Sequence, residues 1–305
     1  MLPQNKGLLL VLFTGLVSGV SIFLNKYAVA VFNPFSFTFL KNAVVAVLLL
    51  AVLVVVYKKN SFANLQLKHW KQLALIGLVG GSIAFLVYFY ALSQTSAINA
   101  GFLHKTLLFV FAGALGTLWL KEKIDKPFAI GAALLLLGNF LAVSKFGGFV
   151  WADALIAVAV VLWALENAYA KKVLAEISGL QVAFGRMFFG GLIMLVFLFF
   201  TNNFPNAAEL SIPQIQWIFV TGGLLFLFAA SFYSGLKWIP VSKATALLSI
   251  GQPVTAVLSV LFLGQAVSAV EAAGFLALLI GVALVGFSVL GSPSPNWHFF
   301  RNSRL

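Results

Sequence analysis

Residues 25–41, NKYAVAVFNPFSFTFLK, are answered 145 positions later by residues 170–186, AKKVLAEISGLQVAFGR. In each stretch a basic residue ends one apolar run, and fifteen residues later a second one, Lys41 or Arg186, lies inside the next run. The two halves also end in similar patterns. The first half has Leu120-Lys121-Glu122, Gly131 and Gly138, and the second has Leu263-Gly264-Gln265, Gly274 and Gly281 at the corresponding places. The chain therefore consists of two related halves, each several membrane-length segments long.

The composition indicates that both halves lie in a lipid bilayer. Apolar residues make up 62% of the 305 positions and charged residues only 9%, whereas a soluble domain averages about 45–50% apolar and about 25% charged. The net charge of +12 comes from basic residues at the ends of apolar runs, which indicates membrane orientation and not nucleic-acid binding. Cysteine is absent, which excludes disulfides, thiolate metal sites and cysteine nucleophiles.

Because about 20 helical residues cross the hydrocarbon core, the sequence predicts ten spans. They are 7–25, 34–56, 72–92, 99–120, 127–144, 150–170, 179–200, 214–236, 243–263 and 270–290. The first run lacks a clean small-residue cleavage site, so we expect a retained span instead of a signal peptide. The predicted fold is an all-α integral membrane protein with a first repeat at 1–145, a second at 146–290 and a cytoplasmic tail at 291–305.

The basic residues predict the orientation. With the N-terminus inside, the cytoplasmic segments hold Lys6, Lys58, Lys59, Lys68, Lys71, Lys121, Lys123, Lys126, Lys171, Lys172, Lys237, Lys243, Arg301 and Arg304, and the opposite loops hold only Lys26 and Lys145. We therefore expect a multi-pass protein of the inner (plasma) membrane with both termini cytoplasmic. Five spans per half is an odd number, so the second repeat is inverted, an arrangement typical of transporters that work by alternating access.

With these features the chain resembles the drug/metabolite transporter superfamily, EamA type, over nearly its whole length. The matching elements are Lys26, Pro34 and Lys41; Trp163, Lys171-Lys172 and Arg186; Ala91-Leu92, Ala97, Ala100 and Leu120-Lys121-Glu122; and Pro253, Gln265, Gly274 and Gly281. The resemblance implies ten helices in two five-helix repeats and transport of a small organic metabolite, with export of amino acids or related metabolites as the usual activity. Val110 stands where the family usually has proline and Gln265 where it usually has glutamate, so the substrate of better-known members does not carry over.

Charges inside spans are candidate gating and coupling groups, because each costs about 2.5–3.5 kcal/mol at mid-bilayer. Glu166 and Arg186 fall at similar depth in the inner third. Either they pair or border an inner gate, or Arg186 extends to the cytoplasmic surface while Lys171 or Lys172 neutralises Glu166. Glu166 is the only carboxylate well inside a predicted span and the leading candidate for proton coupling, although uncoupled transport fits equally well.

A second group of charges lies toward the outer side. Lys41, Lys105 and Lys26 have no acid in the membrane part of the first repeat. They suit a carboxylate or phosphate on the solute, or else they extend to the outer headgroups. We assign Lys41, Lys105, His104, Trp163, Tyr88 and Gln252 to substrate binding, and Glu166, Arg186, Lys26 and Pro253 to gating or coupling.

For several of these residues a structural alternative stays open. His104 either relays protons or is structural, and Gln252-Pro253 either lines the cavity on a kinked helix or shapes packing. Inward-facing aromatic residues would suit an amphipathic organic solute. The repeated glycines, among them Gly131, Gly138, Gly274 and Gly281, permit close helix contact, as a scaffold or as the contact of a homodimer.

Two other functional classes compete with transport. An integral-membrane enzyme needs an acid–base or metal cluster, but the histidines are only His69, His104 and His298, and no HExxH motif or Ser-His-Asp set can be placed. A non-transporting membrane scaffold also fits the residues. We predict a secondary-active or facilitative transporter of an amino-acid-like or other zwitterionic or anionic solute, acting as an exporter. Its partners are the solute and membrane lipid, without nucleic acid, metal or cofactor.

Overall fold

The structure is a computed structural model that describes residues 2–58, 61–95, 97–142, 150–204, 210–264 and 266–291. The regular structure of these residues is helical throughout. Lys59, Lys145, Gln265 and the tail after Gly291 lie outside the described residues.

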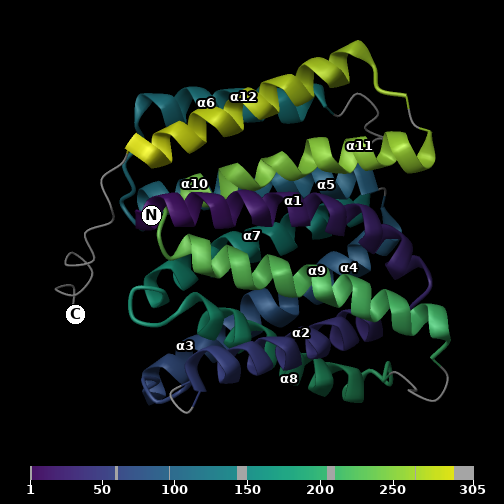
Figure 1. Ribbon diagram of the computed structural model, residues 1–305. Helices are drawn as coiled ribbons and strands as arrows, with labels where there is room; N and C mark the ends of the chain where they lie inside the picture. Colours follow the sequence, from purple (N-terminus) through teal and green to yellow (C-terminus); the bar gives the residue numbers. More distant parts are fainter. Residues whose placement is uncertain are drawn as a thin grey trace.

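Ten apolar segments run back and forth through the bundle (Figure 1). They are α1 (Pro3–Ala30), α2 (Pro34–Tyr57), α3 (Leu67–Ile76) with η2 (Gly77–Ile83) and α4 (Ala84–Gln94), α5 (Ala97–Leu118), α6 (Lys126–Leu141), α7 (Trp151–Val173), α8 (Gly179–Phe200), α9 (Ile212–Leu236), α10 (Val241–Leu247) with η4 (Leu248–Ile250) and α11 (Gly251–Leu263), and α12 (Ala269–Gly291). Nine segments of the described chain are long and apolar enough to cross a membrane, and α6 is a shorter apolar helix. The predicted fold class is confirmed, with segment ends that differ from the predicted ones by a few residues.

Capping residues explain where several segments begin. The Asn33 side chain accepts hydrogen bonds from the first backbone N–H groups of α2, and Pro34 occupies the first helical position. Asp125 caps α6 in the same way, and Ser178 caps α8. Such side chains satisfy N–H groups that have no partner within the helix. These three side chains thus explain why α2, α6 and α8 begin where they do.

The two repeats run in opposite senses. We call the end of the bundle at which α1 begins and α12 ends the start face, on the left in Figure 1. The first helix of repeat one, α1, leaves the start face, whereas the first helix of repeat two, α7, runs toward it. This inversion follows from the five segments in each half.

Glycines bring α6 and α12 together along one edge of the bundle (Figure 1). A Cβ atom on Gly138 would lie 2.7 Å from the carbonyl oxygen of Gly274, and one on Gly131 would lie 2.9 Å from that of Gly281. The small residues that the sequence left as a scaffold or a dimer contact therefore pack against one another within the chain.

Two of the segments are irregular near their middle. The third contains the π-helix η2, in which a Cβ atom on Gly81 would lie 2.1 Å from the carbonyl oxygen of Arg186, so glycine permits a close contact with α8. The ninth segment passes through the 3₁₀ turn η4 shortly before Pro253, which lies in the first turn of α11. Pro253 thus follows a turn in which the α-helical hydrogen-bond pattern is interrupted.

Candidate functional site: a cavity between the repeats

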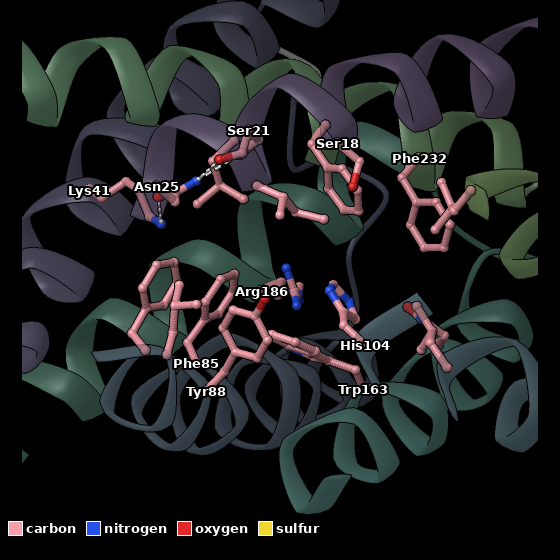
Figure 2. Close-up of a pocket in the computed structure, with 18 of the residues that line it drawn as sticks. Ser18, Ser21, Asn25, Lys41, Phe85, Tyr88, His104, Trp163, Arg186 and Phe232 are labelled. Carbon is pink, nitrogen blue, oxygen red and sulfur yellow. Dashed lines mark hydrogen bonds between the residues drawn. The ribbon is translucent and has the colours of Figure 1, made fainter. Parts of the chain in front are cut away.

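A cavity with an empty volume of about 790 Å³, including its opening, lies between the two repeats (Figure 2). Side chains from α1, α2, α4 and α5 form one part of its wall, and side chains from α7, α8, α9 and η4 form the other. Five residues that the sequence predicted for the site line it: Lys41, Tyr88, His104, Trp163 and Arg186. The cavity therefore brings together candidates from both halves of the sequence.

Aromatic rings cover much of the wall. The Trp163 ring centroid lies 5.0 Å from those of Tyr88 and His104, and the indole N–H donates to the Gly80 carbonyl oxygen at 3.0 Å. Phe232 and Tyr233 also line the cavity, whereas Tyr90 does not and instead stacks on Phe35. Such a wall suits the apolar body of an organic solute.

One charged group of the wall is the Lys41 ammonium. The residue is 1% exposed, and its Nζ donates to Asn25 Oδ1 at 3.1 Å and lies 3.7 Å from the centroid of the Phe89 ring. Within the described ranges it forms no ion pair with a carboxylate. The ammonium is thus held inside the bundle, not at the bilayer surface.

The other charged group of the wall is Arg186, and its partner Glu166 does not itself line the cavity. Arg186 Nε lies 3.6 Å from Glu166 Oε2, and the Tyr233 hydroxyl donates to Glu166 Oε1 at 2.7 Å. Arg186 also donates from Nη2 to the Gly80 carbonyl oxygen at 3.0 Å. Of the two arrangements that the sequence allowed, the structure has the one in which Glu166 and Arg186 are neighbours.

The two lysines offered as alternative partners of Glu166 lie elsewhere. Lys171 donates to the carbonyl oxygens of Leu236 and Ile239, both at 2.7 Å. The Lys172 ammonium lies 4.0 Å from the centroid of the Trp119 ring. Both lysines thus tie α7 to neighbouring segments at the start face.

The remaining predicted site residues lie outside the wall. Lys105 is 2% exposed and donates to Ser18 Oγ at 2.6 Å, so it lies behind a wall residue. Lys26 donates to the Leu92 and Thr95 carbonyl oxygens and ties α1 to the end of α4. Gln252 and Pro253 are partly buried on α11 but do not line the cavity.

Sequence reasoning missed three polar wall residues on α1, namely Ser18, Ser21 and Asn25. Asn25 Nδ2 donates to Ser21 Oγ at 2.8 Å while Asn25 Oδ1 accepts from the Lys41 ammonium. Their spacing of three and four residues places them on one helix face. This spacing is the signal that could have identified them in the sequence.

Acidic residues link the two repeats at the start face. Glu122 accepts hydrogen bonds from the backbone N–H groups of Val241 and Ser242, at the beginning of α10. Glu176 accepts from Lys68 and from His69 Nε2, and these hydrogen bonds lower the pKa of its carboxyl group. Each contact joins a residue of the first half to one of the second.

Asp125 forms a third link of this kind. Its carboxylate accepts from Lys243 Nζ at 2.8 Å and from the Ser288 hydroxyl at 2.7 Å. Partial burial raises the pKa of Asp125, but hydrogen bonds from Lys243, Ser288 and the Phe128 N–H outweigh this and lower it. Asp125, at the start of α6, thus ties this helix to α10 and α12.

Comparisons with known proteins agree with this architecture. Residues 5–144 and 150–287 each match the family model described as the EamA-like transporter family. The chain is similar to Protein LicB of Haemophilus influenzae, with 26% identity over 211 residues that cover 65% of this chain and 68% of that protein. A crystal structure of another protein, with 16% identity, has a TM-score of 0.75 over 94% of this chain and 99% of that chain, which shows a shared fold. The chain therefore belongs to the EamA-like transporter family and is a multi-pass membrane transporter of the drug/metabolite type, not an enzyme.

Proposed function

We propose that this transporter exports a small organic solute that carries a carboxylate, either zwitterionic or anionic, by alternating access through the central cavity. The observation that carries the proposal is the Lys41 ammonium, which is buried in the wall without an acidic partner in the described part of the chain. The basic loops at the start face support a cytoplasmic location for that face and for both termini, in the plasma membrane. A homodimer stays a prediction.

A buried ammonium without an acidic partner favours an anionic ligand. Removal of a charge from water is costly unless an opposite charge or hydrogen bonds compensate. Asn25 supplies one hydrogen bond to Lys41 and the Phe89 ring a cation–π contact. A solute carboxylate would add a charge-assisted hydrogen bond, which is about twice as strong as a neutral one.

The ion pair of Glu166 and Arg186 is suited to act as a gate. Arg186 lines the cavity and lies near the start face, because it is the eighth residue of α8, which begins there. Arg186 is held by Glu166, which accepts from the Tyr233 hydroxyl, and by the Gly80 carbonyl oxygen of η2. In this proposal the cavity opens to the cytoplasm when α8 and η2 move relative to α7 and α9. Glu166 is then the candidate for proton coupling.

The test measures solute flux in proteoliposomes that contain the full chain. A panel of amino acids, organic acids and organic cations is offered with and without a proton gradient. We expect carboxylate-bearing solutes to move, and Lys41→Gln to reduce their flux at least tenfold. Transport of organic cations alone would overturn the proposal, and absence of any flux would favour a scaffold role.

The same assay tests coupling separately. If Glu166 carries the proton, Glu166→Gln abolishes the response of solute flux to the proton gradient while facilitated exchange continues. A Glu166→Gln protein that still concentrates solute in response to the gradient removes Glu166 from this role without affecting the substrate assignment.

A further inference from the structure

The two cations of the cavity are equivalent residues of the two repeats. Lys41 is the eighth residue of α2 and Arg186 the eighth of α8, and they are 145 positions apart. The two matches to the family model begin at residues 5 and 150, with the same offset. Both cations face the Phe85 ring, at 5.9 Å for Lys41 Nζ and 4.8 Å for Arg186 Cζ.

The same offset relates the surroundings of the two cations. Tyr233, whose hydroxyl donates to Glu166, corresponds to Tyr88, which also lines the cavity. Glu166 itself corresponds to Ser21. The second repeat thus has a tyrosine, a carboxylate and an arginine, whereas the first has a tyrosine, a serine and a lysine.

In the first repeat, the tyrosine and the lysine lack a carboxylate partner like the one that Glu166 provides in the second repeat. Among the described residues the Tyr88 hydroxyl forms no hydrogen bond and Lys41 forms no ion pair. Asn25 links Ser21 to Lys41, and Figure 2 shows these three side chains on one side of the cavity. Ser21, the residue that corresponds to Glu166, therefore lines the cavity, and the Asn25 side chain connects it to Lys41.

We propose that the carboxylate of the transported solute takes, in the first repeat, the place that the Glu166 carboxylate takes in the second. The Lys41 ammonium and the Tyr88 hydroxyl bind it, and the small Ser21 side chain leaves room for it. This inference rests on the proposed function and extends it, because it assigns Ser21 and Tyr88 as residues that determine the specificity for a carboxylate.

A variant that adds a carboxylate to the protein at residue 21 tests this assignment of the binding site. In Ser21→Glu an internal acid can pair with Lys41, as Glu166 pairs with Arg186, and so compete with the solute. The matched control Ser21→Gln has the same size without the charge. The probes are 3-phenylpropionate, phenylalanine and phenethylamine, which share an apolar body but are an anion, a zwitterion and a cation.

In proteoliposomes we expect Ser21→Glu to move 3-phenylpropionate and phenylalanine at least tenfold more slowly than Ser21→Gln, and to unfold at a higher temperature. If the wild type moves these carboxylates and the two variants do so equally, the inference fails and the proposed function stands. If the wild type moves phenethylamine alone, or moves neither these probes nor any other carboxylate of the panel, both fail.

A pair of tyrosine variants tests the inference without an added charge. Tyr88→Phe removes a hydroxyl that has no hydrogen-bond partner among the described residues, so it should weaken 3-phenylpropionate binding about tenfold without lowering the unfolding temperature. Tyr233→Phe removes a donor to Glu166 and should lower the unfolding temperature. Unchanged binding in Tyr88→Phe, measured by the thermal shift that 3-phenylpropionate induces, would overturn the assignment of Tyr88.

Discussion

Replacement of Arg186 by methionine should strongly destabilise the fold, because it leaves Glu166 buried without its cation. The Glu166 side chain has no exposed surface, and in the described chain its hydrogen bond comes from the Tyr233 hydroxyl, not from Arg186. Two unit charges separated by the observed 3.6 Å interact by about 5 kcal/mol at an effective dielectric constant of about 20. Removal of one partner from a buried pair typically costs about 3–5 kcal/mol, and we expect a loss of that size.

A double-mutant cycle separates this charge effect from the other contacts of the arginine. Unfolding of the detergent-solubilised protein is measured for Arg186→Met, Glu166→Gln and the double variant. The double variant has no isolated buried charge, so it should be more stable than the sum of the two single losses predicts, by about 1–3 kcal/mol. Additive losses would show that the two side chains do not act as a pair and would refute the reasoning.

Two further changes test packing and the start face. Gly138→Val places a side chain where a Cβ atom would lie 2.7 Å from a backbone oxygen of α12, so it should lower the unfolding temperature; Gly113→Ala, where a Cβ atom meets nothing within 4 Å, should not. Hydrogen bonds from Lys68 and His69 lower the pKa of Glu176 below its ordinary value of 4.5. The stabilisation is therefore present above that value and is lost as the pH falls through the lower folded pKa, so Glu176→Gln should flatten the acid limb of the unfolding temperature against pH.

The topology could be predicted from the sequence because its determinants are local. Apolar runs of membrane length define the segments, and the repeat with an odd number of spans defines their inversion. The similar depth of Glu166 and Arg186 also followed, since counting residues from each helix end gives the depth of a side chain in a bundle, but their pairing was one of two alternatives that the sequence left open.

The direction in which a side chain points could not be predicted in the same way. Nearly all faces of these helices are apolar, so hydrophobic periodicity does not distinguish the cavity side from the lipid side. For this reason Lys105 was expected in the site, although its ammonium binds Ser18, and Asn25 was overlooked although it binds Lys41. The π-helix η2, whose Gly80 carbonyl oxygen accepts from Trp163 and Arg186, likewise has no clear signal in the sequence.

Only one of the two equivalent positions, 21 and 166, carries a carboxylate. This difference bears on how a protein with two related repeats can bind and transport a solute. If both repeats carried the acid, each cation would have an internal partner and a solute carboxylate would gain little by binding. If neither did, the buried Arg186 would lack compensation for the water that it loses. With Glu166 in one repeat and Ser21 in the other, one cation is held within the protein and the other stays available to the cavity. Under the proposed function, exchange between these two roles would require only the addition of an acid at residue 21, which is why Ser21→Glu is the decisive variant.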